Sequence, residues 1–185
     1  MTTSPVLQLL ADRKASRALD PSPLPAELVA ELVEAVRLTP SCRNNQPWRL
    51  TLLESPAARD AGAAALAPGN QVWAARAAVL AVLSARPADD CLTPGGLAYV
   101  GFDVGAASLA LMLAATARGL VARPMAGFDA DALRQAAGLA PEQEPWVVIA
   151  LARPAADESF LPEGLRQLDD KPRQRKPTAE ILARR

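Results

Sequence analysis

Three short segments of this chain carry side chains that could bind a ligand. One is the basic segment 13–17, which reads RKASR, and another is the basic segment 171–177, which reads KPRQRKP. Between them lies the segment 40–50, PSCRNNQPWRL, in which Ser, Cys, Asn and Gln are crowded together just before an apolar run. Arginine offers planar, bidentate donors, so two Arg-rich segments at opposite ends of a neutral chain could together hold a phosphate group.

Each of these segments also has an ordinary structural interpretation. Basic clusters often lie on a solvated surface, and Asn and Ser in loops often hydrogen-bond their own backbone. Gly127 is most simply a turn glycine, and Cys42 is most simply a packed or half-exposed thiol. Residue types alone therefore leave both ligand binding and a surface role open for each segment.

The chain has no histidine, and this absence narrows the possible chemistry. It excludes the Ser-His-Asp triad, Cys-His dyads and nearly every catalytic zinc site. The glycine spacing between Gly95 and Gly105 matches neither the dinucleotide-binding G-x-G-x-x-G pattern nor a phosphate-binding loop. An enzyme with this composition would rely on an organic cofactor held in another kind of site.

Composition predicts a single domain over residues 1–185. Half of the residues are hydrophobic and 22% are charged, as in ordinary globular proteins. The formal net charge is zero, which argues against nucleic acid or membranes as partners. No signal peptide is evident, and the uncharged stretch 104–117 is too short to span a bilayer. Cys42 and Cys91 are far apart and show no metal-binding spacing, so we expect no metal site and a reducing, cytoplasmic location.

Hydrophobic periodicity predicts helices and buried strands mixed in one domain, which favours an α+β fold. The helices are expected at 5–12, 26–38, 56–67, 71–76, 97–118 and 129–137, and the strands at 48–53, 78–85 and 145–153. Residues 67–70 are predicted to form a turn, and residues 119–129 to run extended. The helix at 97–118 is apolar almost all round, which predicts that its neighbours bury it. From Pro154 on, the chain is polar, basic and proline-rich, and we expect a tail, 154–185, that docks on a partner subunit.

Taken in order, the motifs of the chain resemble those of the FMN-dependent nitroreductase superfamily. The most specific element is P-S-x-x-N-x-Q-P-W, which is matched at 40–48. The other elements are RKASR, the pair GN before an apolar strand, GLVARPMAGFD and RQRKP, in this order and spacing over residues 7–182. The resemblance implies a central mixed or antiparallel sheet flanked by helices, with a C-terminal tail that crosses a homodimer. It also implies FMN at the subunit interface and NAD(P)H as the electron donor.

The same resemblance implies roles for individual residues. Arg13 would bind the FMN phosphate together with Arg173 and Arg175. Arg17 would be the catalytic residue, facing N1 and O2 of the isoalloxazine and stabilising the charge that develops there. The polar loop would form a flavin-facing wall supplied by the other subunit. The full set of implied flavin-binding residues is Arg13, Lys14, Ala15, Arg17, Pro40, Ser41, Cys42, Asn44, Asn70, Met125, Ala126, Gly127, Arg173 and Arg175.

The chain departs from the family pattern at three positions. Ala15 stands where Ser is usual, Ala126 stands where many members carry Glu, and Trp73 stands where some members carry Lys. The loss of that Lys predicts less positive charge facing the reduced ring. The interval 86–97 is short, which predicts an open flavin face and tolerance of bulky acceptors.

Three functions remain open from the sequence. The first is ping-pong transfer of hydride from NAD(P)H through flavin N5 to a nitroaromatic, a quinone or a similar small-molecule acceptor. The second is other flavin chemistry within the superfamily, such as dehydrogenation of a peptide-like substrate or reductive dehalogenation. The third is a non-enzymatic interaction module whose basic tail binds an acidic partner.

Overall fold

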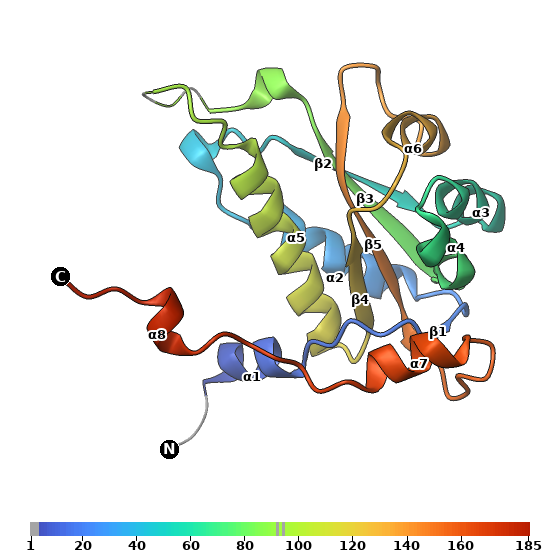
Figure 1. The fold of residues 1–185 in the computed structure, drawn as a ribbon. Coiled ribbons are helices and arrows are strands. Elements are labelled where there is room, and N and C mark those ends of the chain that lie inside the picture. Colours follow the sequence, from blue (N-terminus) through green and yellow to red (C-terminus); the bar gives the residue numbers. More distant parts are fainter. Residues whose placement is uncertain (1–3, 92, 94) are drawn as a thin grey trace.

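An antiparallel sheet forms the centre of the computed structural model, which describes residues 4–91, 93 and 95–185 (Figure 1). Strand β3 (Val79–Ala85) lies between β2 (Trp48–Leu53) and β5 (Glu144–Pro154), and β4 (Val121–Met125) also pairs with β5. The two-residue strand β1 (Leu19–Asp20) pairs with the last two residues of β5. The predicted α+β fold is therefore confirmed, and the extended run after residue 119 is itself a strand.

Helices surround this sheet and begin at recognisable signals. Pro occupies the first turn of α1, α3 and α4, where its missing N–H leaves no hydrogen bond unmade. The side chain of Asp129 accepts hydrogen bonds from the amides of Asp131 and Ala132 and caps α6, as the sequence predicts. The helices are α1 (Pro5–Asp12), α2 (Ala26–Arg37), α3 (Pro56–Ala64), α4 (Pro68–Ala74), α5 (Val100–Ala117), α6 (Ala130–Ala136), α7 (Glu163–Asp170) and α8 (Thr178–Ile181), with short 3₁₀ turns η1 (Cys42–Asn44) and η2 (Pro87–Asp89).

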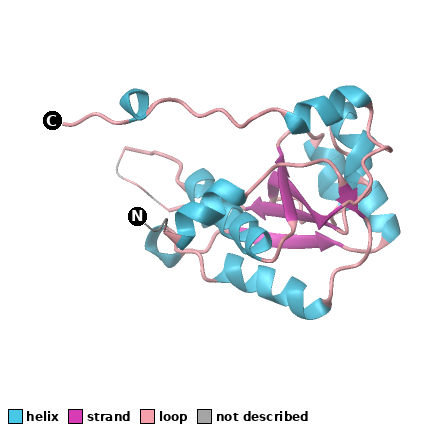
Figure 2. Cartoon of the chain, turned by 90° about the horizontal axis from the view of Figure 1, so that it is seen from below, coloured by secondary structure: helices cyan, strands magenta, loops and turns pink. Residues whose placement is uncertain are grey.

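The core consists of two apolar layers, one on each face of the sheet. Helices lie around the sheet in Figure 2. Along β3, Leu80 and Val82 belong to the layer with α3, α4 and α6, whereas Ala81 and Leu83 belong to the layer with α2 and α5. Side chains of a strand alternate between faces, so a strand buried on both faces must be apolar throughout. This is why β3 and β5 read as continuous apolar runs in the sequence.

Helix α5 is only partly buried, contrary to the expectation of burial all round. Its inner side packs on the sheet and on α2, but Phe102 is 65% exposed and Leu109 is 40% exposed on its outer side. Gly105 lies between them and a Cβ built on it would meet nothing within 4 Å. By length and composition alone α5 could cross a membrane, although the uncharged stretch 104–117 was expected to be too short. Its packing on the sheet is that of a core helix.

Two predicted segments have different boundaries in the structure. The expected turn at 67–70 is the first turn of α4, which begins at Pro68. The expected tail does not leave the domain at Pro154, because Leu161 is buried in the core and α7 packs beyond it. Residues 171–185 are exposed throughout, and they pass α1 and run away from the body of the domain (Figure 1).

The two cysteines are paired, so the expectation of free thiols was wrong. Cys42 and Cys91 form a disulfide across a sequence separation of 49. The bond joins η1 to the segment between β3 and α5. Within the described part of 86–97 the chain forms only the short turn η2, whereas residues 92 and 94 lie outside the described residues.

Candidate functional site

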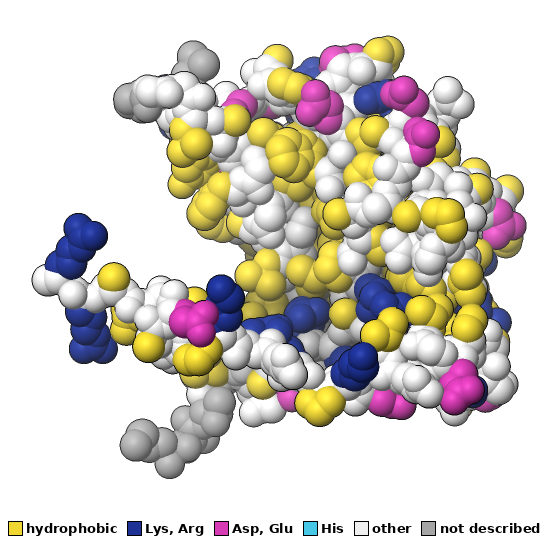
Figure 3. Space-filling model, in the orientation of Figure 1, with side chains coloured by type: hydrophobic (Ala, Val, Ile, Leu, Met, Phe, Trp, Pro, Cys, Tyr) yellow, Lys and Arg dark blue, Asp and Glu magenta, His cyan; other side chains and the backbone are white. Residues whose placement is uncertain are grey.

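A basic cavity of about 650 Å³ lies where the segment after α1 meets the segment after α7. We call it the basic cavity, and its walls are residues 11–15, Arg17, Arg123, 168–173 and Arg175. Seven Lys and Arg residues line it, against three Asp residues. In Figure 3, Lys and Arg atoms gather along the lower side of the hollow between the C-terminal tail and the body of the domain. A cavity of this size and charge can accept a small anionic ligand.

Three arginines act on one another at this cavity although they are far apart in sequence. Burial lowers the pKa of Arg13 from its ordinary value, and the positive charges of Arg173 and Arg175 lower it further. The structure thus brings together the two basic segments that the sequence singled out. Like charges held close together are unfavourable until an anion lies between them, as at a phosphate site.

Arg173 also fastens the tail onto α1. Its Nη1 donates to the carbonyl oxygens of Leu10 at 3.0 Å and Arg13 at 3.1 Å, and its Nη2 donates to the carbonyl of Ala11. These carbonyls lie at the C-terminal end of α1, where helix carbonyls lack partners and a cation is favoured. Arg175 donates to the adjacent carbonyl of Gln174 at 2.7 Å. Part of the guanidinium of Arg173 is therefore already engaged in holding the cavity wall.

Asp169 of α7 pairs with two arginines at the inner end of the basic cavity. Its carboxylate accepts a hydrogen bond from the backbone amide of Arg17 at 2.6 Å and forms an ion pair with the Arg17 guanidinium. Arg123 Nη1 lies 3.9 Å from the same carboxylate and donates to the carbonyl of Ala15 at 2.6 Å. The side chain of Asp169 is only 5% exposed. Neither Asp169 nor Arg123 was predicted from the sequence as a site residue.

Arg123 is the more unusual of these two residues. Burial lowers the pKa of Arg123 and the charge of Arg17 lowers it further, whereas Asp169 raises it. Its Nε is buried and has no hydrogen-bond partner among the residues that the structure describes. Its Cζ lies 5.1 Å from the centre of the Trp73 ring, which is completely buried. The one available signal was a charged residue placed at a core-facing position of an otherwise apolar strand.

Asn70 and Gly127 lie beside each other at the end of β4. The amide of Ala67 donates to the carbonyl of Gly127 at 2.8 Å, and a Cβ built on Gly127 would lie 3.8 Å from Asn70 Nδ2. It would also lie 3.2 Å from the Cβ of Ala67, so this position favours glycine. Met125 is buried and Ala126 is exposed. These four predicted residues lie at or near the end of β4, and none of them lines the basic cavity.

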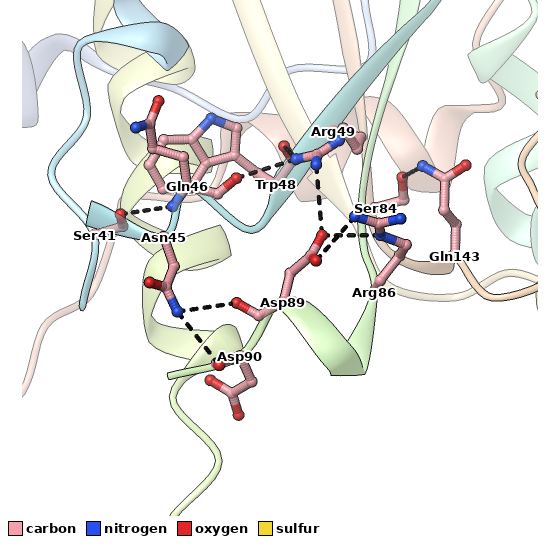
Figure 4. Close-up of polar contacts among 10 residues, drawn as sticks. All are labelled: Ser41, Asn45, Gln46, Trp48, Arg49, Ser84, Arg86, Asp89, Asp90 and Gln143. Carbon is pink, nitrogen blue, oxygen red and sulfur yellow. Dashed lines mark hydrogen bonds and ion pairs between the residues drawn. The ribbon is translucent and has the colours of Figure 1, made fainter. Parts of the chain in front are cut away.

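The polar loop, residues 40–47, is held in a defined and strained shape (Figure 4). Ser41 Oγ accepts a hydrogen bond from the amide of Gln46 at 2.9 Å, and Cys42 N donates to the buried Asp103 of α5 at 3.1 Å. Asn45 Nδ2 lies 3.4 Å from two carbonyl oxygens of the segment that follows β3. Arg43, Asn44 and Gln46 have φ of 51°, 59° and 48°, a region that non-glycine residues rarely adopt. Such strain is often found at functional loops.

Within one chain, the polar loop lies far from the basic cavity. The loop is bonded to Asp103 near the start of α5, whereas α1 and the cavity lie at the other end of that helix (Figure 1). A helix of 18 residues is about 27 Å long. Pro40, Ser41, Cys42 and Asn44 therefore do not meet the arginines of the cavity in a single chain.

Known proteins resemble this chain both in sequence and in fold. A family model described as the nitroreductase family matches residues 10–86 and 64–153. A Streptomyces coelicolor protein, assigned provisionally as an NADH dehydrogenase/NAD(P)H nitroreductase, is 29% identical over 170 residues, which cover 82% of this chain and 86% of that protein. A solved structure described as an oxidoreductase containing FMN has a TM-score of 0.82 and 28% identity, with 99% of this chain and 93% of that chain covered. A Desulfovibrio desulfuricans protein, assigned provisionally as a nitroreductase and solved with FMN, has a TM-score of 0.77 and 25% identity, with 100% and 98% covered.

Proposed function

The chain belongs to the nitroreductase family, and we propose that it is an FMN-dependent oxidoreductase that takes reducing equivalents from NAD(P)H. We further propose a nitroaromatic, quinone or similar acceptor, reduced by ping-pong exchange. The observation that carries this proposal is the convergence of Arg13, Arg173 and Arg175 on one cavity. Their mutual repulsion fits a cofactor that carries a phosphate. The buried Nε of Arg123, which has no partner among the described residues, fits an electron-rich ring edge.

The residues of the site would hold and polarise the cofactor. Arg13 and Arg175 would bind its phosphate. Arg173 would also bind it, through the guanidinium N–H groups that do not donate to the carbonyls of α1. Arg17, fixed by Asp169, would face the pyrimidine edge of the ring. When bound, FMN supplies the redox chemistry, by accepting a hydride from the nicotinamide and passing it on. Such a reaction asks for positioning and electrostatics, which suits a chain that has no histidine.

We propose that two copies of the chain are needed to complete the site. The polar loop would reach the flavin from the partner subunit, since in its own chain it lies at the far end of α5. Apolar side chains are exposed where such a partner would pack: Phe102 and Leu109 on α5, Leu7 on α1 and Ile181 on α8. Exposed apolar surface of this kind is typical of an interface between subunits. The partner would also cover residues 171–185.

Two further proposals concern access and location. The short interval 86–97 would leave the flavin face open to bulky acceptors, since its described residues form no helix longer than η2. The proposed location is the cytoplasm, and the Cys42–Cys91 disulfide argues against it, because disulfides are rare in that reducing compartment.

The test is the cofactor content and redox activity of the purified protein. We expect a yellow protein whose released flavin co-elutes with FMN, and oxidation of NADH or NADPH that depends on an added quinone or nitroaromatic. Initial rates measured against both substrates should give parallel reciprocal plots, as ping-pong exchange requires. A colourless protein that takes up no FMN at micromolar concentration would exclude the proposed cofactor. Bound FMN that NAD(P)H does not reduce would instead favour other flavin chemistry of the family.

A further inference from the structure

Arg123 occupies a position in which a charged side chain has little structural justification. It lies on the strand face that otherwise packs Val121 and Met125 into the core, and its side chain is only 17% exposed. Burying a cation away from water is costly unless it is fully paired. Its Nε has no partner among the described residues, and the nearest carboxylate, at 3.9 Å, is already bonded to Arg17.

The charges at the inner end of the basic cavity therefore do not cancel. Arg17 and Arg123 share one carboxylate, that of Asp169, which leaves one positive charge uncompensated in this group. The hydrogen bonds of Asp169 go to Arg17, through both its backbone amide and its guanidinium. Arg123 is thus the guanidinium whose charge is the less neutralised.

The position of Arg123 links the basic cavity to the group around Asn70. Its Nη1 donates to Ala15, within the basic segment that lines the cavity, and its Cζ lies over the ring of Trp73 on α4. Trp73 lies one turn after Asn70 on that helix, and Gly127 follows β4 directly beside Asn70. A planar ring that extends from the cavity toward Asn70 and Gly127 would pass Arg123 on the way.

We propose that Arg123 supplies the positive charge that stabilises the reduced, negatively charged pyrimidine edge of the flavin, and that Asp169 limits the share contributed by Arg17. The inference rests on the proposed FMN function. It revises the expectation that Trp73 leaves the ring with less positive charge, since the charge comes from β4. A fixed cation in a water-poor site stabilises developing negative charge strongly.

The experiment measures the midpoint potential of bound FMN and its affinity for sulfite in the parent, Arg123→Gln and Arg123→Lys. Gln removes the charge but keeps a donor for the carbonyl of Ala15, whereas Lys keeps the charge. We expect Arg123→Gln to weaken sulfite binding about tenfold and to lower the potential by about 30 mV, the equivalent of tenfold for a two-electron couple. Arg123→Lys should restore most of both values. A role confined to packing would change thermal stability and FMN affinity but would leave the potential unchanged.

Two further variants keep the test decisive. Asp169→Asn should shift the potential upward, because it frees the charge of Arg17. Arg76→Met is the matched control for the loss of an arginine that lies over an aromatic ring. The Cζ of Arg76 lies 3.9 Å from the centre of the Phe160 ring, and Arg76 does not line the basic cavity. If Arg123→Gln retains FMN at the parental potential, the inference is wrong while the proposed function stands. If Arg123→Gln loses FMN, its potential cannot be measured, and the potential of Asp169→Asn then decides. A potential that falls or does not change in Asp169→Asn overturns the inference. A parent protein without FMN would overturn the proposed function instead.

Discussion

Arg173 Nη1 donates a hydrogen bond at 3.1 Å to the carbonyl oxygen of Arg13, across 160 positions of the sequence. Both residues line the basic cavity, and the same guanidinium also bonds the carbonyl of Leu10 at the end of α1. The tail is therefore fastened to α1 by a residue of the site itself. The resemblance to the family assigned Arg173 and Arg175 the same role, which is binding the FMN phosphate. This contact gives Arg173 a second role, which is holding the tail on α1.

The first prediction compares these two arginines. Arg175→Ala should weaken FMN binding about 10- to 100-fold, because a charge-assisted hydrogen bond is worth roughly 1.5–3 kcal/mol. It should leave the tail in place, since Arg175 bonds only its neighbour Gln174 among the described residues. Arg173→Ala should weaken FMN binding and also speed the cleavage of residues 171–185 by protease, because it removes the hydrogen bonds that hold the tail on α1. Fluorescence titration with FMN and limited proteolysis measure the two effects.

The exposed Arg184→Ala serves as the control for a general change in tail charge. It should change neither FMN affinity nor protease sensitivity, because isolated surface charges contribute little. An Arg175→Ala variant that binds FMN as tightly as the parent would remove Arg175 from the proposed phosphate site.

The second prediction concerns the disulfide. In the chain-entropy account, a bond that closes a loop of 49 residues restricts the unfolded chain by about 4 kcal/mol, and typical native losses are about 2–4 kcal/mol. Cys91→Ala should therefore lower the free energy of unfolding by about 2–4 kcal/mol under oxidising conditions. In dithiothreitol, the parent and the variant should converge to within about 1 kcal/mol. Denaturation with urea measures both. Two alkylatable thiols in the unreduced, unfolded parent would show that the bond does not form.

Much of the fold is predictable from hydrophobic periodicity, because burial on one or both faces dictates the pattern. The strand at Trp48–Leu53 and the helix cap at Asp129 follow directly from local residue types. The two basic segments could be found for the same reason, since charge clusters are visible in a linear sequence. Arginine chemistry raised the possibility that they hold one phosphate together, and the resemblance to the family assigned Arg13, Arg173 and Arg175 to it.

The rest depends on contacts that no local pattern encodes. Asp169 looks like one more polar residue ahead of a basic tail, and only the packing of α7 brings it to Arg17. Arg123 reads as a charged residue in an extended run until β4 is seen to turn it toward Trp73. Cys42 and Cys91 show no spacing signal, since their pairing depends on how the segment after β3 folds back on the polar loop.

The third prediction uses the backbone of the polar loop. Asn44 has φ of 59°, in the left-handed region. A residue with a β-carbon loses about 1–2 kcal/mol of conformational free energy in this region. The loss is smaller for Asn, because its short polar side chain can hydrogen-bond locally. Asn44→Ala should destabilise the fold by about 1 kcal/mol, and Asn44→Gly should be close to neutral. If the loop forms a flavin wall, both variants should weaken FMN binding, since both lose the amide. Urea denaturation and FMN titration separate the two effects. Unchanged FMN affinity in both would leave Asn44 with a backbone role alone.

The fourth prediction tests whether the outer face of α5 is the subunit interface. Leu109 is 40% exposed there, and Val72 on α4 is 52% exposed on a different helix, so the two form a matched pair. Leu109→Glu places a charge in the proposed apolar interface, where burying an unpaired charge is costly, and should shift the protein from dimer to monomer. The same variant should lose FMN, because the partner's polar loop would no longer complete the site. Val72→Glu should remain a dimer with the parental FMN content. Light scattering measures the oligomeric state, and absorbance measures the FMN content of the same sample. A parent protein that is monomeric at micromolar concentration and fully loaded with FMN would show that one chain forms the site alone.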